Sequence, residues 1–548
     1  MSSEQVNAAN LTVTLRATVG DAVSAALRTL RGEGVAAKLA AKDASLWGPQ
    51  AQSEAAIRLG WVDLARSSRE LLPEIERIVA RKRAAGLDHV VLAGMGGSSL
   101  APEVIVASRG GELTTLDTTD PHQVRRAMAD RLDRTVLVVS SKSGTTVETD
   151  SHRRAYEQAF REAGIDPADR VVVVTDPGSP LADLAAEHGY PTVLADPNVG
   201  GRYSALTAFG LVPSALAGVD VAALLDEAAA LSETLAGDSD NPALELGAAL
   251  GGFSGHDKIV LAGETPVGMG DWIEQLVAES TGKEGTGLLP VVVESAEAAG
   301  FAPGPDAHLV AFDENATPDV PLADTLVAGP LGAQFLAWEY ATAVAGRLLG
   351  INPFDQPNVQ ESKDNTKALL EKSLAAGDSD DPLAGGAPLL VDGAVEVHCA
   401  DAALFADAKD LTEVLQRLVR AVPEAGYLAV MAYLDRYGDA SAAALRPMLA
   451  SLTPCPVTFG WGPRFLHSTG QYHKGGPANG VFLQLTGEVT EDLDVPGRAY
   501  SFGRLQLAQA LGDFGALGDR GRPAVRLHLR ERSAGLARLH EALERVEP

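Results

Sequence analysis

Short runs of apolar and β-branched residues begin at His89 and recur along the chain, and segments with helical apolar spacing separate most of them. The first series consists of HVVLAGMGG, GELTTLDTTD, RTVLVVSSKSG, DRVVVVTDPGS and YPTVLADP. Runs that are apolar almost throughout are typical of strands buried on both faces. Because such strands alternate with helices, the sequence predicts an α/β fold with a parallel, doubly wound sheet covered by helices on both sides.

A second series of the same kind starts at DKIVLAGET (257–265) and continues through GLLPVVVES, AHLVAFDE and a long apolar helix over residues 329–350. The stretch AAGDSDDPLAGGAP that follows (375–388) has no apolar period and predicts a loop or linker. Beyond it, AVEVHCA, YLAVMAYL, PVTFGWG, GVFLQLTG and VRLHLR predict further strands. No repeat of fixed period is visible in the sequence.

These patterns divide the 548 residues into three parts. Residues 1–65 predict mainly helices after a short extended start, and they precede a first α/β domain over residues 66–245. Residues 246–548 predict a second α/β domain with an enlarged C-terminal region. A chain of this length is expected to hold several cores, since one domain spans roughly 150 residues.

The net charge of −28, from 45 basic and 73 acidic residues, excludes whole classes of partner. Nucleic acids and anionic membranes are bound through an excess of Lys and Arg, so neither is expected here. An anionic small molecule is allowed where a local pocket supplies the donors. The sequence shows neither a signal-peptide pattern nor a run of about 18 apolar residues, and we therefore expect a cytoplasmic protein. Cys399 and Cys455 lie in unrelated contexts and predict neither a disulfide nor a zinc site.

The run VVLAGMGGSSLAPEV predicts a strand, a glycine-rich turn and the start of a helix. Gly96 and Gly97 would let backbone amides approach a phosphate at the helix end, and Ser98 adds a hydroxyl donor. A dinucleotide fold is the competing interpretation, because Asp117 lies near the end of the next strand, where an acid can bind a ribose. The third glycine of that motif is missing.

A second loop, in VLVVSSKSGTTVET, also joins a predicted strand to a predicted helix. Hydroxyls, helix-end amides and one ammonium in such a loop suit three phosphate oxygens without a large local charge. The alternative is that the Ser and Thr side chains only cap the helix and form the turn. The candidate phosphate ligands of this loop are Ser141, Lys142, Ser143, Thr145 and Thr146.

The two loops resemble the first ligand-binding loops of sugar-isomerase (SIS) domains, and together they are similar to the glucose-6-phosphate isomerase family. The likeness continues through GGRYSALTAFGL (200–211), ESTGK (279–283) and INPFDQPNVQESK (351–363). The segment FGWGPRFLHSTGQYHKGGPANGVFLQL resembles the isomerase part of bacterial transaldolase/glucose-6-phosphate isomerase fusions. The resemblance implies two SIS-type αβα sandwiches with parallel sheets, preceded by N-terminal helices.

The resemblance also assigns the catalytic groups. Glu279 would be the base that moves a proton between C2 and C1, and Arg202 would stabilise the enediolate. Lys363 would assist ring opening or hold the sugar oxygens, with Lys367 one turn later as its rival. Gln356 would be a neighbouring sugar contact.

The ring-opening histidine is less determined, because three candidates are present. His467 and Gln471 match the HxxxQ pattern of the family, and imidazole suits proton transfer near neutral pH. His473 lies in the same loop, and His308 follows Glu279 at the expected interval. We rank His467 first, although the usual order places this histidine between the glutamate and the lysine, whereas here it comes last.

The resemblance implies an aldose–ketose isomerase of glycolysis and gluconeogenesis that interconverts glucose 6-phosphate and fructose 6-phosphate through a cis-enediolate. It implies no metal and no cofactor, a sugar phosphate as the small-molecule partner, and a homodimer. Three alternatives stay open at this point: a non-catalytic phosphosugar-binding SIS regulator, a dinucleotide-dependent enzyme, and an isomerase that also accepts mannose 6-phosphate or another sugar phosphate.

Overall fold

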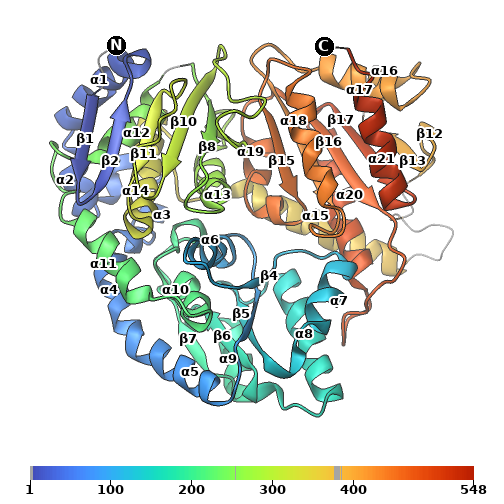
Figure 1. Ribbon diagram of the computed structural model, residues 1–548, viewed down its shortest axis with the longest axis horizontal. Coiled ribbons are helices and arrows are strands. Elements are labelled where there is room, and N and C mark those ends of the chain that lie inside the picture. Colours follow the sequence, from blue (N-terminus) through green and yellow to red (C-terminus); the bar gives the residue numbers. More distant parts are fainter. Residues whose placement is uncertain (1–3, 254, 376–382, 384–385, 401, 548) are drawn as a thin grey trace.

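The computed structural model contains three β-sheets covered by helices (Figure 1). It describes residues 4–253, 255–375, 383, 386–400 and 402–547, and within these ranges it leaves out the side chains of residues 359–363, 375 and 402. The predicted α/β class with parallel sheets is confirmed. Most of the predicted linker at 375–388 lies outside the described residues. Among the helices described, none combines the length and apolar composition needed to cross a membrane.

The first sheet is parallel throughout and, with its helices, forms what we call the first unit (residues 72–216). In spatial order its strands are β4 (Thr114–Leu116), β3 (His89–Ala93), β5 (Thr135–Ser140), β6 (Val171–Thr175) and β7 (Thr192–Leu194). Its helices are α5 (Leu72–Ala84), α6 (Leu100–Ser108), α7 (Pro121–Ala129), α8 (Val147–Glu162), α9 (Pro180–His188) and α10 (Ala208–Leu216).

Alternate residues of its strands belong to different cores, as the two-residue period of a strand requires. Val90 and Leu92 pack with α5, α6 and α10, whereas Val91 and Ala93 pack with α7, α8 and α9. Helices therefore cover both faces of the sheet, which accounts for the uninterrupted apolar runs in the sequence.

The second sheet joins the start of the chain to its middle, and we call its residues the second unit (4–32 and 242–349). Four of its strands are parallel, and the N-terminal hairpin extends it in antiparallel register. In spatial order the strands are β9 (Leu289–Val292), β8 (Lys258–Ala262), β10 (Ala307–Asp313), β11 (Thr325–Ala328), β2 (Leu11–Leu15) and β1 (Glu4–Ala8). Its helices are α1 (Ala17–Gly32), α12 (Pro242–Gly252), α13 (Met269–Thr281) and α14 (Leu331–Leu349).

The third sheet forms the C-terminal unit (residues 390–543), and it again combines four parallel strands with an antiparallel hairpin. In spatial order the strands are β15 (Val457–Trp461), β14 (Tyr427–Tyr433), β16 (Gly480–Gly487), β17 (Ala524–Leu529), β13 (Val395–Cys399) and β12 (Leu390–Asp392). Its helices are α16 (Ala402–Phe405), α17 (Leu411–Arg420), α18 (Leu445–Ala450), α19 (Gly470–Gly475), α20 (Phe502–Asp519) and α21 (Arg532–Leu543).

The chain regions outside these units are mostly helical. The N-terminal part adds α2 (Val35–Ala40), α3 (Gln52–Ala55) and α4 (Leu64–Ser67), and α11 (Val221–Ser232) packs on α14. The long helix α15 (Pro357–Ala375) follows the NPFDQ segment and contacts α19 and α20.

The segment predicted as one second domain, residues 246–548, thus contains two sheets rather than one. The predicted N-terminal helical part also contributes two strands to the second sheet. Parallel strands in all three sheets follow the same plan, in which the second strand lies on one side of the first and the later strands on the other. The second and C-terminal units share even the antiparallel hairpin at the far edge.

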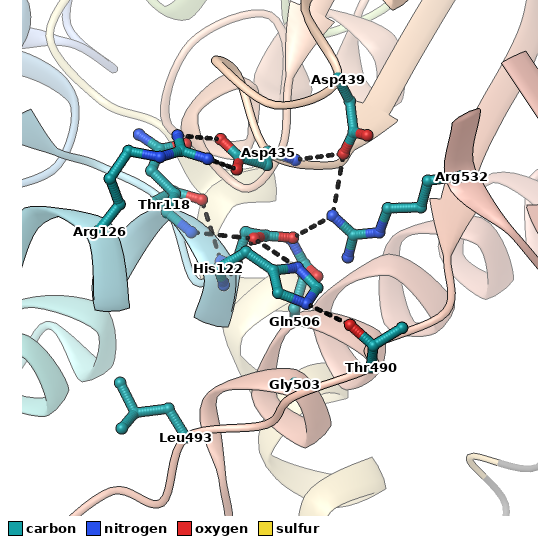
Figure 2. Close-up of polar contacts among 12 residues, drawn as sticks. Thr118, His122, Arg126, Asp435, Asp439, Thr490, Leu493, Gly503, Gln506 and Arg532 are labelled. Atoms are coloured by element: carbon teal, nitrogen blue, oxygen red, sulfur yellow. Dashed lines mark hydrogen bonds and ion pairs between the residues drawn. The ribbon is translucent and has the colours of Figure 1, made fainter.

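Buried ion pairs join the first unit to the C-terminal unit, as Figure 2 shows. Arg532 Nη1 lies 2.8 Å from Asp120 Oδ2 and donates to Asp439 Oδ2 at 2.9 Å. Asp120 also caps α7 by accepting hydrogen bonds from the backbone of His122 and Gln123. Burial opposes ionisation of Asp120, but these hydrogen bonds and Arg532 hold its pKa below the usual value.

Replacing Arg532 by Met is expected to destabilise the protein by about 3 kcal/mol, because Asp120 stays fully buried without its counter-charge. The thermal midpoint of Arg532→Met measures this loss. Arg530→Met is the matched control, since Arg530 is more than half exposed and its ion pair with Glu396 is long at 3.7 Å. Such an exposed pair contributes little to stability. Equal midpoints for the two variants would contradict the prediction.

Candidate active site

The two predicted phosphate loops lie at one edge of the first sheet. The GMGGSS loop follows β3, forms the short helix η4 (Gly96–Ser98) and leads into α6. The SSKSGTT loop follows β5 and leads into α8. Since β3 and β5 are parallel neighbours at which the strand order reverses, both loops border the crevice where α/β sheets bind ligands.

The second loop presents hydroxyls at its tip. Gly144 has a φ of +69°, a left-handed conformation that favours glycine and turns the chain sharply. Ser143 and Thr145 are exposed, and their hydroxyls lie 2.9 Å apart. Ser141 is buried and holds the turn together through Thr146 and the amide of Gly144. The exposed hydroxyls are the ones that a phosphate can reach.

Lys142 points to a different partner from the one the sequence suggests. Its ammonium forms an ion pair with Asp176 and donates to the backbone carbonyl of Pro197. This pairing neutralises the only cation of the loop, so hydroxyls and amides remain as its phosphate donors. A phosphate contact for Lys142 stays a prediction that requires the ammonium to leave Asp176.

The first loop packs against two other predicted site segments. A Cβ built on Gly97 would overlap the carbonyl oxygen of Gly201, and one on Gly96 would lie 3.2 Å from Cβ of His467. Close backbone approach therefore requires glycine at position 97, whereas at position 96 a φ of +55° and the amide nitrogen of Gln275, 2.6 Å from the added Cβ, favour it. Ser98 follows in the same buried turn. The structure thus brings the GMGG, GGR and HSTGQ motifs together.

Arg202 is almost completely buried and held from several sides. Its Nη1 donates to Oε1 of Gln356 at 2.7 Å, its Nε donates to Oγ of Ser280 at 2.7 Å, and its Nη2 donates to the carbonyl of Pro353. Nη1 also lies 3.3 Å from Oε1 of Glu279. The guanidinium is a fixed cation beside the predicted base, and it brings Gln356 into the site.

Glu279 lies near the end of α13, where its carboxylate has two partners. Oε1 faces Arg202, and Oε2 accepts a hydrogen bond from Nε2 of Gln275 at 3.1 Å. The same Gln275 nitrogen donates to the backbone carbonyl of His467 at 2.9 Å. Sequence reasoning missed Gln275, although its position four residues before Glu279 puts both side chains on one face of the helix.

His467 ends the short helix η10 (Arg464–His467) that follows β15. Its Nε2 lies 3.2 Å from Oε1 of Glu148, a buried carboxylate in the first turn of α8. The same oxygen accepts a hydrogen bond from Gln509 at 2.7 Å. Sequence reasoning missed Glu148, the penultimate residue of the quoted VLVVSSKSGTTVET run. The available signal was an acid two residues after the last loop hydroxyl, Thr146.

The other two histidine candidates lie in the core. His473 is bonded to the hydroxyl of Tyr427 at 3.0 Å, and burial holds its pKa well below the usual value. His308 is fully buried on β10 beside Thr325, where burial lowers its pKa to about 4. Among the described contacts neither shares a hydrogen-bond partner with Glu279, whereas His467 does so through Gln275, so the geometry favours His467.

The lysine of the NPFDQ motif is only partly placed. Lys363 belongs to α15, which contacts η10 and α19, but its side chain lies outside the described residues. Its rival Lys367 is largely exposed, with the nearest carboxylate of Glu371 at 3.9 Å. Gln471 is fully buried and uses its amide to join Gly282 to Asn358. We infer that Gln471 positions these segments, while its direct contact with a sugar stays a prediction.

Lys283 and Glu274, two ionisable groups beside the predicted catalytic residues, have shifted pKa values. Burial lowers the pKa of Lys283 to about 8, and the positive charge of Arg202 adds to this effect. Lys283 is bonded to Asp355 and to the carbonyl of Asn352, which fixes the ESTGK segment to the NPFDQ segment. Burial raises the pKa of Glu274 to about 8, with a further contribution from the charge of Asp271.

Asp117, the acid of the competing dinucleotide interpretation, is buried and engaged within the protein. Its Oδ2 lies 2.9 Å from Nε of Arg464 and accepts a hydrogen bond from Ser99 at 3.4 Å. An acid that binds a ribose must present a free oxygen to the ligand. The geometry therefore does not favour a nucleotide at this position.

Two other features lie away from these residues. His89, Glu112 and Asp130 approach closely enough to hold a metal ion, but Arg131 forms ion pairs with both acids and already supplies the cation. A cavity of about 820 Å³ lies between α8 and residues 492–504, and its lining includes none of the predicted catalytic residues. We therefore locate the candidate active site from the side-chain geometry around Gln275.

The strand order, the two hydroxyl- and glycine-rich loops and the buried Arg–Glu pair define a protein of the SIS-type α/β class. The family model of phosphoglucose isomerase matches residues 77–252. A probable glucose-6-phosphate isomerase of Haloarcula marismortui is 31% identical over 52% of this chain and 79% of its own length. The glucose-6-phosphate isomerase of Symbiobacterium thermophilum is 30% identical over 57% of this chain and 87% of its own.

Solved structures agree in fold. A hypothetical protein of Thermus thermophilus superposes with a TM-score of 0.53 at 26% identity, covering 66% of this chain and 96% of its own. A glucose-6-phosphate isomerase of Chlamydia trachomatis gives a TM-score of 0.53 at 18% identity over 69% and 91% of the two chains. With relatives at this identity and coverage, the chain belongs to the glucose-6-phosphate isomerase family.

Replacing Gly97 by Ala is expected to push the first loop away from Gly201, because the new Cβ has no room. Phosphate-ligand affinity should fall at least about tenfold, and titration with 6-phosphogluconate measures it. Gly200→Ala on the opposing segment is the control, since its Cβ would meet nothing closer than 3.9 Å. Unchanged affinity in Gly97→Ala would contradict the prediction.

Glu274 predicts a pH dependence of stability. The pKa of this carboxyl group rises from 4.5 in the unfolded chain to about 8 in the folded protein. Its protonation therefore stabilises the fold fully below pH 4.5, and this stabilisation is lost as the pH rises toward 8. Glu274→Gln, which stays neutral, should therefore gain roughly 3.5 kcal/mol over the native protein between pH 5 and pH 8. Denaturant unfolding of both proteins at these two pH values tests this prediction. An equal difference in the free energy of unfolding at pH 5 and pH 8 would refute it.

Proposed function

We propose that this protein is an aldose–ketose isomerase that interconverts glucose 6-phosphate and fructose 6-phosphate. The observation that carries the proposal is the meeting of Glu279, Arg202 and His467 around Gln275, beside Gly96. These groups come from distant parts of the chain and supply a base, a cation and a second acid–base. Membership in the glucose-6-phosphate isomerase family supports the same function.

Glu279 would perform the proton transfer. In the open-chain aldose it takes the proton from C2, the C–H electron pair forms the C1–C2 double bond, and the C1 carbonyl pair moves to O1 to give the enediolate. The O2 proton then passes to O1, the carbonyl forms at C2, and Glu279 returns its proton to C1 to give the ketose. Arg202 faces the carboxylate at 3.3 Å and would stabilise the negative charge on the enediolate oxygens. The reaction moves a proton and an electron pair within one substrate, so it requires no redox partner.

His467 would open the sugar ring by exchanging a proton with the ring oxygen. Glu148 accepts from its Nε2 and would fix the ring orientation and balance the imidazolium charge. This leaves Nδ1 of His467 for the substrate. The family resemblance adds Lys363 as a second contributor, and α15 lies beside η10 as that role requires.

The phosphate would be bound by Ser143, Thr145, the amides of the GMGG turn and the first turn of α8. Thr146, the residue before this helix, makes no capping hydrogen bond with its side chain. Helix-start amides therefore remain as donors for an anion. Because the phosphate is remote from C1 and C2, its binding energy serves to orient the reacting carbons.

The function is tested directly by incubating the purified protein with fructose 6-phosphate and following glucose 6-phosphate through a coupled dehydrogenase. Formation of glucose 6-phosphate at enzymatic rates is expected. Binding of fructose 6-phosphate without turnover would instead favour the non-catalytic phosphosugar regulator. Parallel assays with mannose 6-phosphate decide whether the protein also accepts the epimer at C2.

Glu279→Gln is expected to lower kcat at least about 10³-fold, because the amide cannot take up the C2 proton. The fold and the affinity for 6-phosphogluconate should change little, since the single amide oxygen of Gln can still face Arg202 and Gln275 keeps its hydrogen bond to the carbonyl of His467. Glu297→Gln, at an exposed site bonded to Ser295, controls for loss of a carboxylate. Retention of more than a tenth of the activity by Glu279→Gln would exclude it as the base.

A cytoplasmic location, a role in glycolysis and gluconeogenesis, and a homodimer are further proposals from the family resemblance. Sedimentation of the purified protein tests the oligomeric state. A dimer is expected to sediment at twice the 56.9 kDa mass of the chain.

A further inference from the structure

Arg464 begins the short helix η10, three residues before His467, and is 8% exposed. Its guanidinium reaches from the C-terminal unit to two carboxylates of the first unit. Nε lies 2.9 Å from Oδ2 of Asp117, and Nη2 donates to Oε2 of Glu103. A third acid, Asp271 of α13, is more distant at 3.9 Å.

Asp117 links this ion pair to the glycine-rich loop. It follows β4 directly, and its Oδ2 accepts a hydrogen bond from Oγ of Ser99 at 3.4 Å. The backbone N–H of Ser99 donates to the carbonyl of Gly96 at 2.9 Å, and the same carbonyl lies 3.1 Å from the Ser99 hydroxyl. Since Gly96 packs against His467, a closed path of contacts runs from the loop through Asp117 and Arg464 to the histidine.

His467 is thereby held at three points. Glu148 holds its imidazole ring, Gln275 holds its backbone carbonyl, and Arg464 holds the start of the short helix that carries it. Glu148 belongs to the first unit and Gln275 to the second. The imidazole ring reaches Glu148 only while the histidine helix keeps its orientation. A bidentate, planar guanidinium can fix the helix in one orientation between two carboxylates.

We propose that Arg464, through Asp117 and Glu103, is a positioning residue that sets His467 against the glycine-rich loop for ring opening. This inference rests on the proposed isomerase function. Glu279 has its own anchors, Arg202 and Gln275, and makes no contact with Arg464 among the described residues. Loss of Arg464 should therefore impair ring opening more than proton transfer.

The groups around Arg464 allow its ion pair with Asp117 to be removed without leaving an unpaired buried charge. Burial opposes ionisation of Glu103, but Arg464 and Arg436 together hold its pKa near 2, and Arg436 remains when Arg464 is replaced. Burial raises the pKa of Asp117 despite Arg464, so Asp117 can take up a proton in the variant. The double variant Asp117→Asn/Arg464→Met removes both charges and provides a second test in case Arg464→Met folds poorly.

The experiment compares two substrates. Fructose 6-phosphate must be opened before it isomerises, whereas 5-deoxyfructose 6-phosphate lacks the ring oxygen and stays open-chain. Exchange of the C1 hydrogen in deuterated water, followed by NMR, reports proton transfer for both. Arg464→Met and the double variant should lose about tenfold or more on fructose 6-phosphate but less than about threefold on the 5-deoxy analogue.

Arg126→Met is the matched control, because Arg126 joins the same two units through Asp435 but does not lie on the histidine helix (Figure 2). It should leave the ratio of the two rates unchanged. Arg464→Lys keeps the charge and should restore part of the lost ratio. An equal loss on both substrates, or no loss, in Arg464→Met and the double variant would overturn the inference.

A second measurement separates this inference from the proposed function. In protein labelled with ¹⁵N-histidine, Arg464→Met should shift or broaden the imidazole signals of His467, assigned with His467→Asn, while Arg126→Met leaves them in place. If the native protein acts on neither substrate, the isomerase proposal fails. Unchanged His467 signals in Arg464→Met would then reject the positioning role independently.

Discussion

Carboxylates at one edge of the first sheet and arginines of the C-terminal unit form the contact on which the site depends. Asp117 and Glu103 face Arg464, and Asp120 faces Arg532. A buried ion pair contributes little net stability compared with an apolar contact, because both charges lose their hydration. It does penalise any arrangement that leaves a charge unpaired. Since His467 and Glu148 belong to these two units, their contact exists only while the units meet in this register.

The succession of the second and C-terminal units along the chain explains the unusual order of the predicted catalytic motifs. Glu279 lies on the helix that connects the first two parallel strands of the second unit, and His467 follows the second parallel strand of the C-terminal unit. Glu279 therefore lies in the first crossover of its sheet, whereas His467 lies in the second crossover of the C-terminal sheet. Helix α15, with Lys363, lies between these sheets along the chain. The order Glu279, Lys363, His467 follows directly from this arrangement.

Local patterns predicted much of the fold and the identity of the loops. The strands were predictable because burial on both faces leaves a continuous apolar run, and the loops because a turn beside a phosphate needs glycine and hydroxyl groups. The division of residues 246–548 between two sheets was not predictable from the sequence. The second and C-terminal units repeat a strand order, and that repetition leaves no repeated residues in the sequence.

Three residues have partners that the sequence does not reveal, because distant contacts decide what these residues pair with. Asp117 has the local context of a ribose-binding acid but meets Arg464, which lies far along the chain. Lys142 has the context of a phosphate ligand but meets Asp176 from the next strand. Glu148 could be read as a solvated helix-start acid until His467 is placed beside it. In each case local sequence chemistry is correct about residue type and silent about the partner.

The same pairing reconciles a net charge of −28 with an anionic substrate. Carboxylates around the site are matched locally: Glu279 by Arg202 and Asp355 by Lys283. Charges on the outer surface act through salt with a screening length of about 8 Å under physiological conditions, so their repulsion weakens before the phosphate reaches the loops. Inside the crevice, hydroxyls and amides of the two loops contribute hydrogen bonds that carry no net charge. Capture of the phosphate therefore depends on how these neutral donors are arranged, and that arrangement is fixed by the backbone contacts of Gly97 and Gly201.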